Sequence, residues 1–163
     1  MLSSFKSFAM LKTGSPFPDF SVLNHDGRTV TGAELRALGS LVVFFYPRAN
    51  TPGCTLEAKR FRDEAPAFAA AGATIVGVSQ DPPALQACFA SDHSLPFALL
   101  CDEKGDLYRA FGLKKYLGLI PRRTTFIFGP DGRLAQTFDS MLNAGEHVDV
   151  ALSAVQRLNA GTR

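Results

Sequence analysis

The chain has 163 residues, of which 46% are hydrophobic, and a formal net charge of +2. This length suffices to bury a core within one domain, and no repeat or low-complexity segment divides it, so we expect residues 1–163 to form a single domain. The small, scattered charge argues against a nucleic-acid-binding protein. No apolar run approaches the ~18 residues of a membrane-spanning helix, so no membrane partner is expected.

Residues 1–14 are rich in serine and lysine and contain no acidic residue, which faintly resembles an organelle transit peptide. The segment is short, and it lacks arginine and a secretory apolar region. We expect an N-terminal extension, or a true start at Met10, rather than a targeting segment. Three cysteines without paired spacing favour a reducing, cytoplasmic location.

Apolar patterns and turn signals predict alternating strands and helices along the chain. Strands are expected on both sides of a turn at 25–28 and over 41–45, 74–78, 97–100 and 125–128, with a hairpin turn at 129–132 leading into a strand over 133–138. Helices are expected from about 54 to 71, where Gly72 ends the helix, and over 82–92, 106–111 and 146–158. This alternation predicts an α/β fold.

One cysteine lies at the junction between the apolar strand 41–46 and the helix that follows. Pro47, Pro52 and Gly53 end the strand, so Cys54 falls in the first turn of the helix. Unpaired backbone N–H groups and the positive end of the helix macrodipole favour a thiolate at that position. The alternative is a small buried core residue, since free cysteine is among the most buried residue types.

Pro47, Thr51 and Cys54 match the active-site pattern Pro-x-x-x-Thr-x-x-Cys, and the chain here resembles a peroxiredoxin. The longer string around Cys54 is similar to the Q-type branch, also called bacterioferritin comigratory proteins. The resemblance implies a thioredoxin-like fold: a central mixed sheet flanked by helices, with an N-terminal β-hairpin extension. It also implies reduction of hydrogen peroxide or organic hydroperoxides, recycling by thioredoxin or glutaredoxin, no cofactor or metal, and a monomer or weak homodimer.

Peroxide reduction requires an ionised sulfur and donors that hold the peroxide oxygens. The Thr51 hydroxyl is expected to contact the sulfur and the peroxide, and the N–H groups of Gly53 and Cys54 are further donors. Pro47 is expected to shield the loop from water. The resemblance assigns the arginine over the sulfur to Arg123, whose guanidinium stays charged and offers fixed donors. Arg122 matches no motif position and is interpreted as a surface charge.

The second half of the catalytic cycle is left open by the sequence. Many Q-type proteins carry a resolving cysteine five residues after the first, but that position is Lys59 here. Cys88, on the helix 82–92, is the internal candidate if Phe89 faces the core and turns Cys88 partly outward. Cys101 precedes acidic residues that raise a thiol pKa, and we interpret it as a packing residue. An external thiol is the remaining alternative.

Two other functions share this fold. One is a one-cysteine peroxidase that an external thiol resolves, and the other is a redox-sensing or chaperone-like binding protein. The absence of Cys-x-x-Cys argues against a dithiol oxidoreductase of the thioredoxin type. A metal site built from Cys88, His93 and Cys101 matches no familiar zinc spacing. His147, on the last helix, is expected to face solvent.

Overall fold

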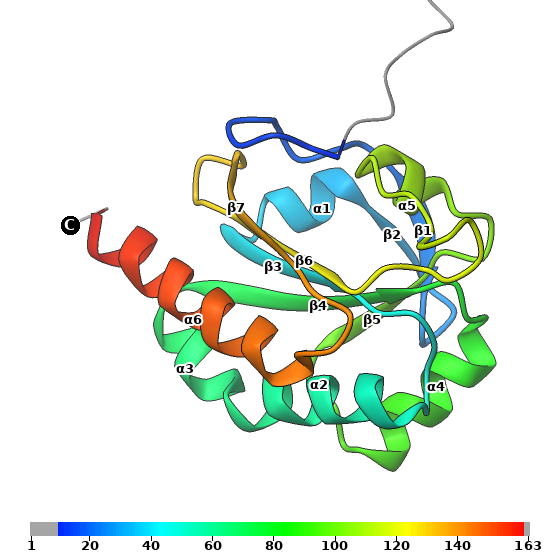
Figure 1. Ribbon diagram of the computed structural model, residues 1–163. Helices are drawn as coiled ribbons and strands as arrows, with labels where there is room; N and C mark the ends of the chain where they lie inside the picture. Colours follow the sequence, from blue (N-terminus) through cyan, green and yellow to red (C-terminus); the bar gives the residue numbers. More distant parts are fainter. Residues whose placement is uncertain (1–9, 162–163) are drawn as a thin grey trace, which may run out of the picture.

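The protein, described here by a computed structural model over residues 10–161, is built on one seven-stranded sheet (Figure 1). The strands lie in the order β2-β1-β5-β4-β3-β6-β7. Their bounds are β1 Ser21–Asn24, β2 Thr29–Thr31, β3 Ser40–Phe45, β4 Ala73–Ser79, β5 Ala98–Cys101, β6 Thr124–Phe128 and β7 Leu134–Asp139. The helices are α1 Gly32–Arg36, α2 Pro52–Asp63, α3 Ala65–Ala70, α4 Pro83–Asp92, α5 Asp106–Ala110 and α6 Ala144–Gly161.

The sheet is mixed, as the family resemblance implied. Strands β3, β4 and β5 are parallel at its centre, whereas β6 and β7 add antiparallel strands at one edge. The hairpin β1-β2 joins the other edge through antiparallel pairing of β1 with β5. The parallel strands are connected through helices because a parallel connection needs a crossover.

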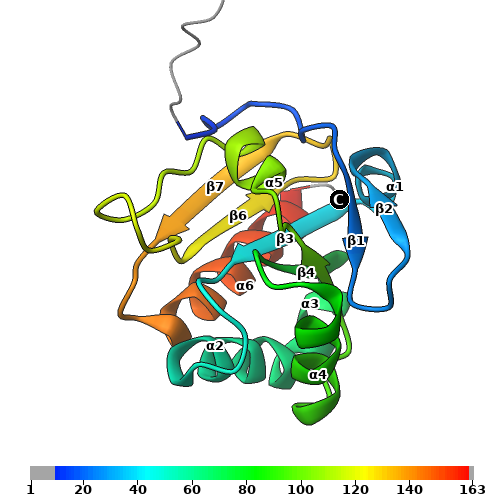
Figure 2. The same cartoon turned by 90° about the vertical axis from the view of Figure 1, so that its right-hand side faces the viewer.

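Helices cover both faces of the sheet, so its central strands are buried on both sides. Figure 2 shows α2, α3, α4 and α6 on one face and α1 and α5 on the other. All six residues of β3 are buried, and their side chains alternate between two cores. Phe44 packs into the α2 side with Phe61 and Phe89, while Phe45 packs into the α5 side with Phe111.

Two elements differ from the sequence prediction. The helix expected to run to residue 71 is divided into α2 and α3 at Glu64, because Pro66 in the first turn of α3 has no N–H to continue the α2 hydrogen bonds. Helix α1 was not predicted, since its five residues are too few for a periodic pattern; the Thr31 side chain caps it by accepting from Glu34 N–H at 3.2 Å.

The pairing of β3 with β6 sets the position of the sequence motif. The two strands are antiparallel, with Phe45 opposite Thr124. The end of β3, which leads to Cys54, therefore lies beside the start of β6, which Arg123 precedes. Within residues 10–161, none of the helices has both the length and the hydropathy that crossing a bilayer requires.

Gly77 tests how tightly the core under the central strands is packed. A Cβ atom at this buried position of β4 would lie 2.7 Å from Leu99 Cδ2 and 2.9 Å from Phe44 Cζ. We expect Gly77→Ala to lower the free energy of unfolding by about 1–3 kcal/mol through overpacking, measured by urea denaturation. Gly161→Ala is the control, since nothing lies within 4 Å of that Cβ. Equal stability of the two variants would contradict the packing argument.

Candidate active site

Cys54 is the third residue of α2 and its side chain is 1% exposed. Thr51 is the N-cap in extended conformation, and Pro52 is the first helical residue. The N–H groups of Gly53 and Cys54 come too early in the helix to have partners within it, so they remain available as donors. Cys54 does pack with the α2 side of the core, but its sulfur also has a charged neighbour.

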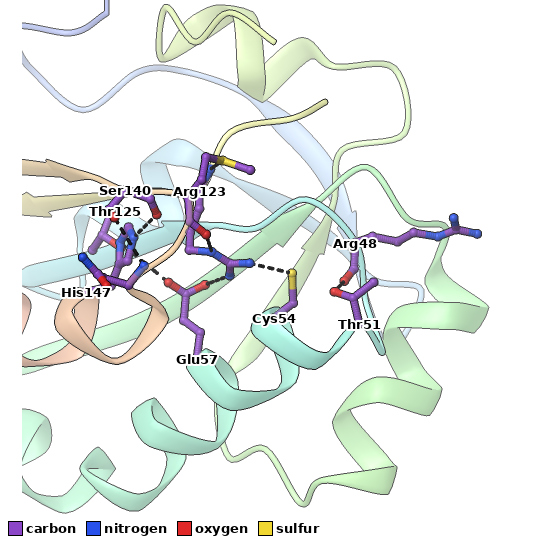
Figure 3. Close-up of polar contacts among 10 residues, drawn as sticks. Arg48, Thr51, Cys54, Glu57, Arg123, Thr125, Ser140 and His147 are labelled. Carbon is purple, nitrogen blue, oxygen red and sulfur yellow. Dashed lines mark hydrogen bonds and ion pairs between the residues drawn. The ribbon is translucent and has the colours of Figure 1, made fainter. Parts of the chain in front are cut away.

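Arg123 reaches the sulfur from the segment before β6 and is itself only 5% exposed. Its Nη2 donates to Cys54 Sγ at 3.4 Å and its Nη1 donates to Glu57 Oε1 at 2.9 Å (Figure 3). Its Nε donates to the carbonyl oxygen of Met141 at 3.2 Å. The guanidinium is therefore held on three sides, with one donor aimed at the thiol. The structure thus brings together the two residues that the sequence motif and the resemblance paired.

Gly53 allows the guanidinium to approach the helix. A Cβ atom at this position would lie 3.0 Å from Arg123 Nη2, which is closer than side-chain carbons normally come to a neighbour. Glycine is thus favoured at this position by the close approach of the arginine rather than by a positive φ angle. Arg122, the adjacent arginine, instead pairs with Asp139 at 2.6 Å and is half-exposed.

Thr51 and Pro47 lie on the loop that leads into α2, and both are half-buried. The Thr51 hydroxyl donates to the carbonyl oxygen of Arg48 at 2.8 Å (Figure 3). Its hydrogen is therefore not directed at the sulfur in this structure, contrary to the expectation from the sequence. Its oxygen keeps lone pairs that can accept a hydrogen. The loop is anchored by Asp81, whose Oδ2 accepts from Ala49 N–H at 2.7 Å.

Glu57 and His147 extend the site, and neither was predicted to belong to it. The sequence assigned no role to Glu57, and His147 was expected to face solvent. Both side chains are in fact 0% exposed. The His147 prediction was wrong because the imidazole turns inward and is buried with Val148 and Ala151 of α6. The spacing of Cys54 and Glu57 by three residues, which places them on one helix face, was the available signal.

Hydrogen bonds fix the imidazole of His147. Its Nε2 contacts the carbonyl oxygen of Ser140 at 2.8 Å and its Nδ1 contacts Thr125 Oγ1 at 2.8 Å (Figure 3). Glu57 Oε2 lies 3.6 Å from Nδ1 and has no hydrogen-bond partner among the described residues. Oε2 and Nδ1 therefore face each other within the buried interior, beyond hydrogen-bond distance.

Burial displaces the protonation equilibria of both groups. Desolvation raises the pKa of Glu57 to about 8, although Arg123 opposes the change. Desolvation lowers the pKa of His147 to about 4, and Arg123 adds to the effect. At neutral pH the raised pKa therefore favours a protonated Glu57, unlike a glutamate in water. The lowered pKa of His147 keeps its imidazole neutral well below neutral pH.

The other two cysteines lie in different environments. Cys88 is exposed on α4, while its neighbours Gln86 and Phe89 are buried, as the sequence analysis expected for an outward-turned Cys88. Cys101 on β5 is 5% exposed, and burial, followed by Glu103 and Asp81, raises its pKa to about 11. This inert thiol fits the predicted packing role. All three cysteines are free thiols.

Comparison with known proteins connects this geometry to a family. The AhpC/TSA family model matches residues 13–137. The chain is 35% identical over 150 residues to chloroplastic peroxiredoxin Q of Gentiana triflora, covering 91% of this chain and 69% of that protein.

Solved structures agree with the sequence comparison. Peroxidoxin BcpB of Mycobacterium tuberculosis superposes with a TM-score of 0.84 at 37% identity, covering 91% of this chain and 98% of that one. Peroxiredoxin Q of Xanthomonas campestris gives a TM-score of 0.82 at 30% identity, covering 94% and 99%. These likenesses confirm the thioredoxin-like architecture that the resemblance implied.

The displaced pKa values of Glu57 and His147 predict how stability depends on pH. Between about pH 5 and 6 the unfolded chain carries one proton on His147, whose ordinary pKa is 6.5, and the folded chain carries one on Glu57. The proton counts are equal, so the pair adds no slope to the free energy of unfolding in the wild type.

Single substitutions unbalance this pair. In Glu57→Gln only His147 remains, and below pH 6.5 the folded state binds fewer protons on it than the unfolded state does. We therefore expect the free energy of unfolding to fall as pH drops from about 6.5 toward 4. In His147→Gln only Glu57 remains, and above pH 4.5 the folded state binds more protons on it than the unfolded state does. The free energy of unfolding should therefore fall as pH rises from 4.5 toward about 8. Each slope is at most about 1.4 kcal/mol per pH unit. Urea denaturation over a pH series measures them, with the exposed Glu146→Gln as control; parallel curves for all variants would contradict the assignment.

Proposed function

Since the chain belongs to the peroxiredoxin family, in its Q-type branch, we propose that Cys54 is the cysteine that attacks the peroxide. As a peroxiredoxin the protein is a thiol peroxidase. The observation that most directly supports this role is the hydrogen bond that Arg123 Nη2 donates to Cys54 Sγ at 3.4 Å, in the first turn of a helix. Both the guanidinium and the helix N-terminus stabilise a negative sulfur.

The reaction follows from these groups. The Cys54 thiolate attacks one oxygen of the hydroperoxide; an S–O bond forms, the O–O bond breaks, and the leaving alkoxide or hydroxide takes up a proton. Arg123 and the N–H groups of Gly53 and Cys54 are the donors that stabilise the negative charge as it moves from sulfur to oxygen. The Thr51 oxygen accepts the hydrogen of the bound hydroperoxide through a free lone pair, which its hydrogen bond to Arg48 leaves available.

Hydrogen peroxide and small organic hydroperoxides are the proposed substrates. A structural study of the Xanthomonas campestris bacterioferritin comigratory protein, which is 30% identical to this chain, concerns alkyl peroxide reduction activity. The 1% exposure of Cys54 in this chain favours small substrates. We assign the shielding of the loop from water to Pro47.

Cys88 is the proposed resolving thiol. It is exposed, whereas Cys101 is buried with a raised pKa, so Cys88 is the internal thiol that solvent and partner proteins can reach. A bond between Cys54 and Cys88 requires their Cα atoms to lie within about 7 Å, which calls for local unwinding. Helix α4 is suited to this, since only Gln86, Phe89 and Ala90 of its ten residues are buried.

A disulfide that includes an exposed cysteine is open to attack by a dithiol protein. We therefore propose thioredoxin or glutaredoxin as the reductant and a reducing compartment of the cell as the place of action.

Arg123 can be tested against its neighbour. We expect Arg123→Lys to slow oxidation of Cys54 by hydrogen peroxide on the order of a hundredfold, because lysine cannot present two donors to sulfur and peroxide in a fixed plane. Stopped-flow single-turnover measurements give this rate. Arg122→Lys, which alters only the contact with Asp139, should stay within a few-fold of wild type. A wild-type rate for Arg123→Lys would remove the guanidinium from the mechanism.

Cys88→Ser separates the two modes of resolution. After one equivalent of hydrogen peroxide, the wild type should show a Cys54–Cys88 disulfide by non-reducing mass and peptide mapping. Cys88→Ser should instead accumulate sulfenic and then sulfinic Cys54, and lose turnover with thioredoxin. Cys101→Ser is the matched control and should behave as wild type. Full turnover of Cys88→Ser with thioredoxin would establish a one-cysteine cycle with an external resolving thiol.

A further inference from the structure

Two buried acids on α2 share a single buried cation. Cys54 and Glu57 lie one turn apart on the same helix face, and both contact the guanidinium of Arg123, at 3.4 Å and 2.9 Å respectively. Neither acid is more than 1% exposed. One positive charge balances one negative charge, and a second anion in a site closed to water carries a large desolvation penalty.

Among residues 10–161, the groups around Glu57 supply no second positive charge. Arg123 faces it from the start of β6 and His147 from α6, while Asp139 of β7 acts on His147 electrostatically. The carbonyl of Ser140 can only accept, so His147 Nε2 carries a hydrogen. Because burial keeps the imidazole neutral, its Nδ1 is an acceptor, which receives the Thr125 hydroxyl.

The free carboxyl oxygen of Glu57 is best accounted for by a proton. Oε2 is buried without a hydrogen-bond partner among the described residues, and the Nδ1 acceptor of His147 lies 3.6 Å away. The Thr125 hydroxyl already occupies the lone pair of Nδ1, so an ionised carboxylate would leave a negative charge on a buried oxygen that no donor contacts. A carboxylic acid would leave only a neutral group there, which costs less to bury without a partner, while Oε1 still accepts from Arg123.

We propose that Glu57 is a neutral carboxylic acid while Cys54 is the thiolate, and that it ionises to become the counter-ion of Arg123 once the sulfur loses its charge. This inference rests on the proposed role of Cys54. The raised pKa of Glu57 agrees with it. Glu57 is therefore a positioning residue that acts through Arg123.

The exchange balances protons and charge. When the thiolate is converted to sulfenic acid, the sulfur side loses one negative charge and the leaving alkoxide takes up one proton from solvent. Glu57 then releases one proton and assumes the negative charge beside Arg123. The buried cluster thus keeps the same net charge before and after the oxidation step, and no additional oxidant or reductant is involved.

Infrared difference spectroscopy tests the protonation state directly. Reduced wild-type protein near neutral pH, measured against reduced Glu57→Gln, should show the C=O stretch of one carboxylic acid. The band should disappear after one equivalent of hydrogen peroxide. It should also be absent from the difference between Cys54→Ser and Cys54→Ser/Glu57→Gln, because Arg123 is then free to pair with an ionised Glu57. The exposed Glu146→Gln should leave the band unchanged.

The pH profile of Cys54 oxidation is the second readout. In the wild type, loss of the Glu57 proton at alkaline pH places a second anion on Arg123, so we expect the rate to fall there. Glu57→Gln should lack this alkaline decline, whereas Glu146→Gln should retain it. A purely structural role for Glu57 would lower the rate equally at all pH values.

The outcomes separate this inference from the proposed function. Absence of the band in reduced wild type, its persistence in Cys54→Ser, or an unchanged alkaline decline in Glu57→Gln would each overturn the exchange, even if peroxide still oxidises Cys54. Failure of peroxide to oxidise Cys54 would overturn the peroxidase role instead, and the comparison with Cys54→Ser would still report whether thiol and carboxyl compete for Arg123.

Discussion

The site depends on a cation held out of water. Arg123 is 5% exposed, and an isolated guanidinium in such a place would be strongly unfavourable. It is tolerated because the protein surrounds it with acceptors: the carboxyl of Glu57, the sulfur of Cys54 and the carbonyl of Met141. The same requirement makes the arginine useful, since a desolvated cation acts far more strongly on a nearby sulfur than a solvated one.

The fold brings these groups together through one strand pairing. The end of β3 and the start of β6 are adjacent because the strands are antiparallel. The loop and first turn of α2 follow β3, and Arg123 immediately precedes β6. Residues far apart in sequence therefore meet at one end of this strand pair. Helix α6 then closes the site from the α2 side by contributing His147.

How much of this could be read from the sequence depends on the range of each signal. Cys54 was placed correctly because a strand, a turn and a helix start are all local patterns. Arg123 could be assigned through resemblance alone, since no local pattern distinguishes it from Arg122. The burial of Glu57 and His147 was not predicted, because a buried polar residue looks like a surface residue until its partner is known; only the spacing of Glu57 from Cys54 pointed to the site. The division of α2 from α3 was missed although Pro66 marked it, because the apolar spacing continues across the break.

Gly53 has a consequence for the motion of the active-site helix. Its missing Cβ leaves room for the guanidinium, but glycine within a helix is less stable than alanine by roughly 0.5–1 kcal/mol. The first turn of α2 is therefore easier to unwind than the same turn with alanine would be. This is the place where the sulfur must leave its pocket to meet another thiol. The residue that lets the arginine approach the reduced sulfur also makes it easier for the oxidised sulfur to depart.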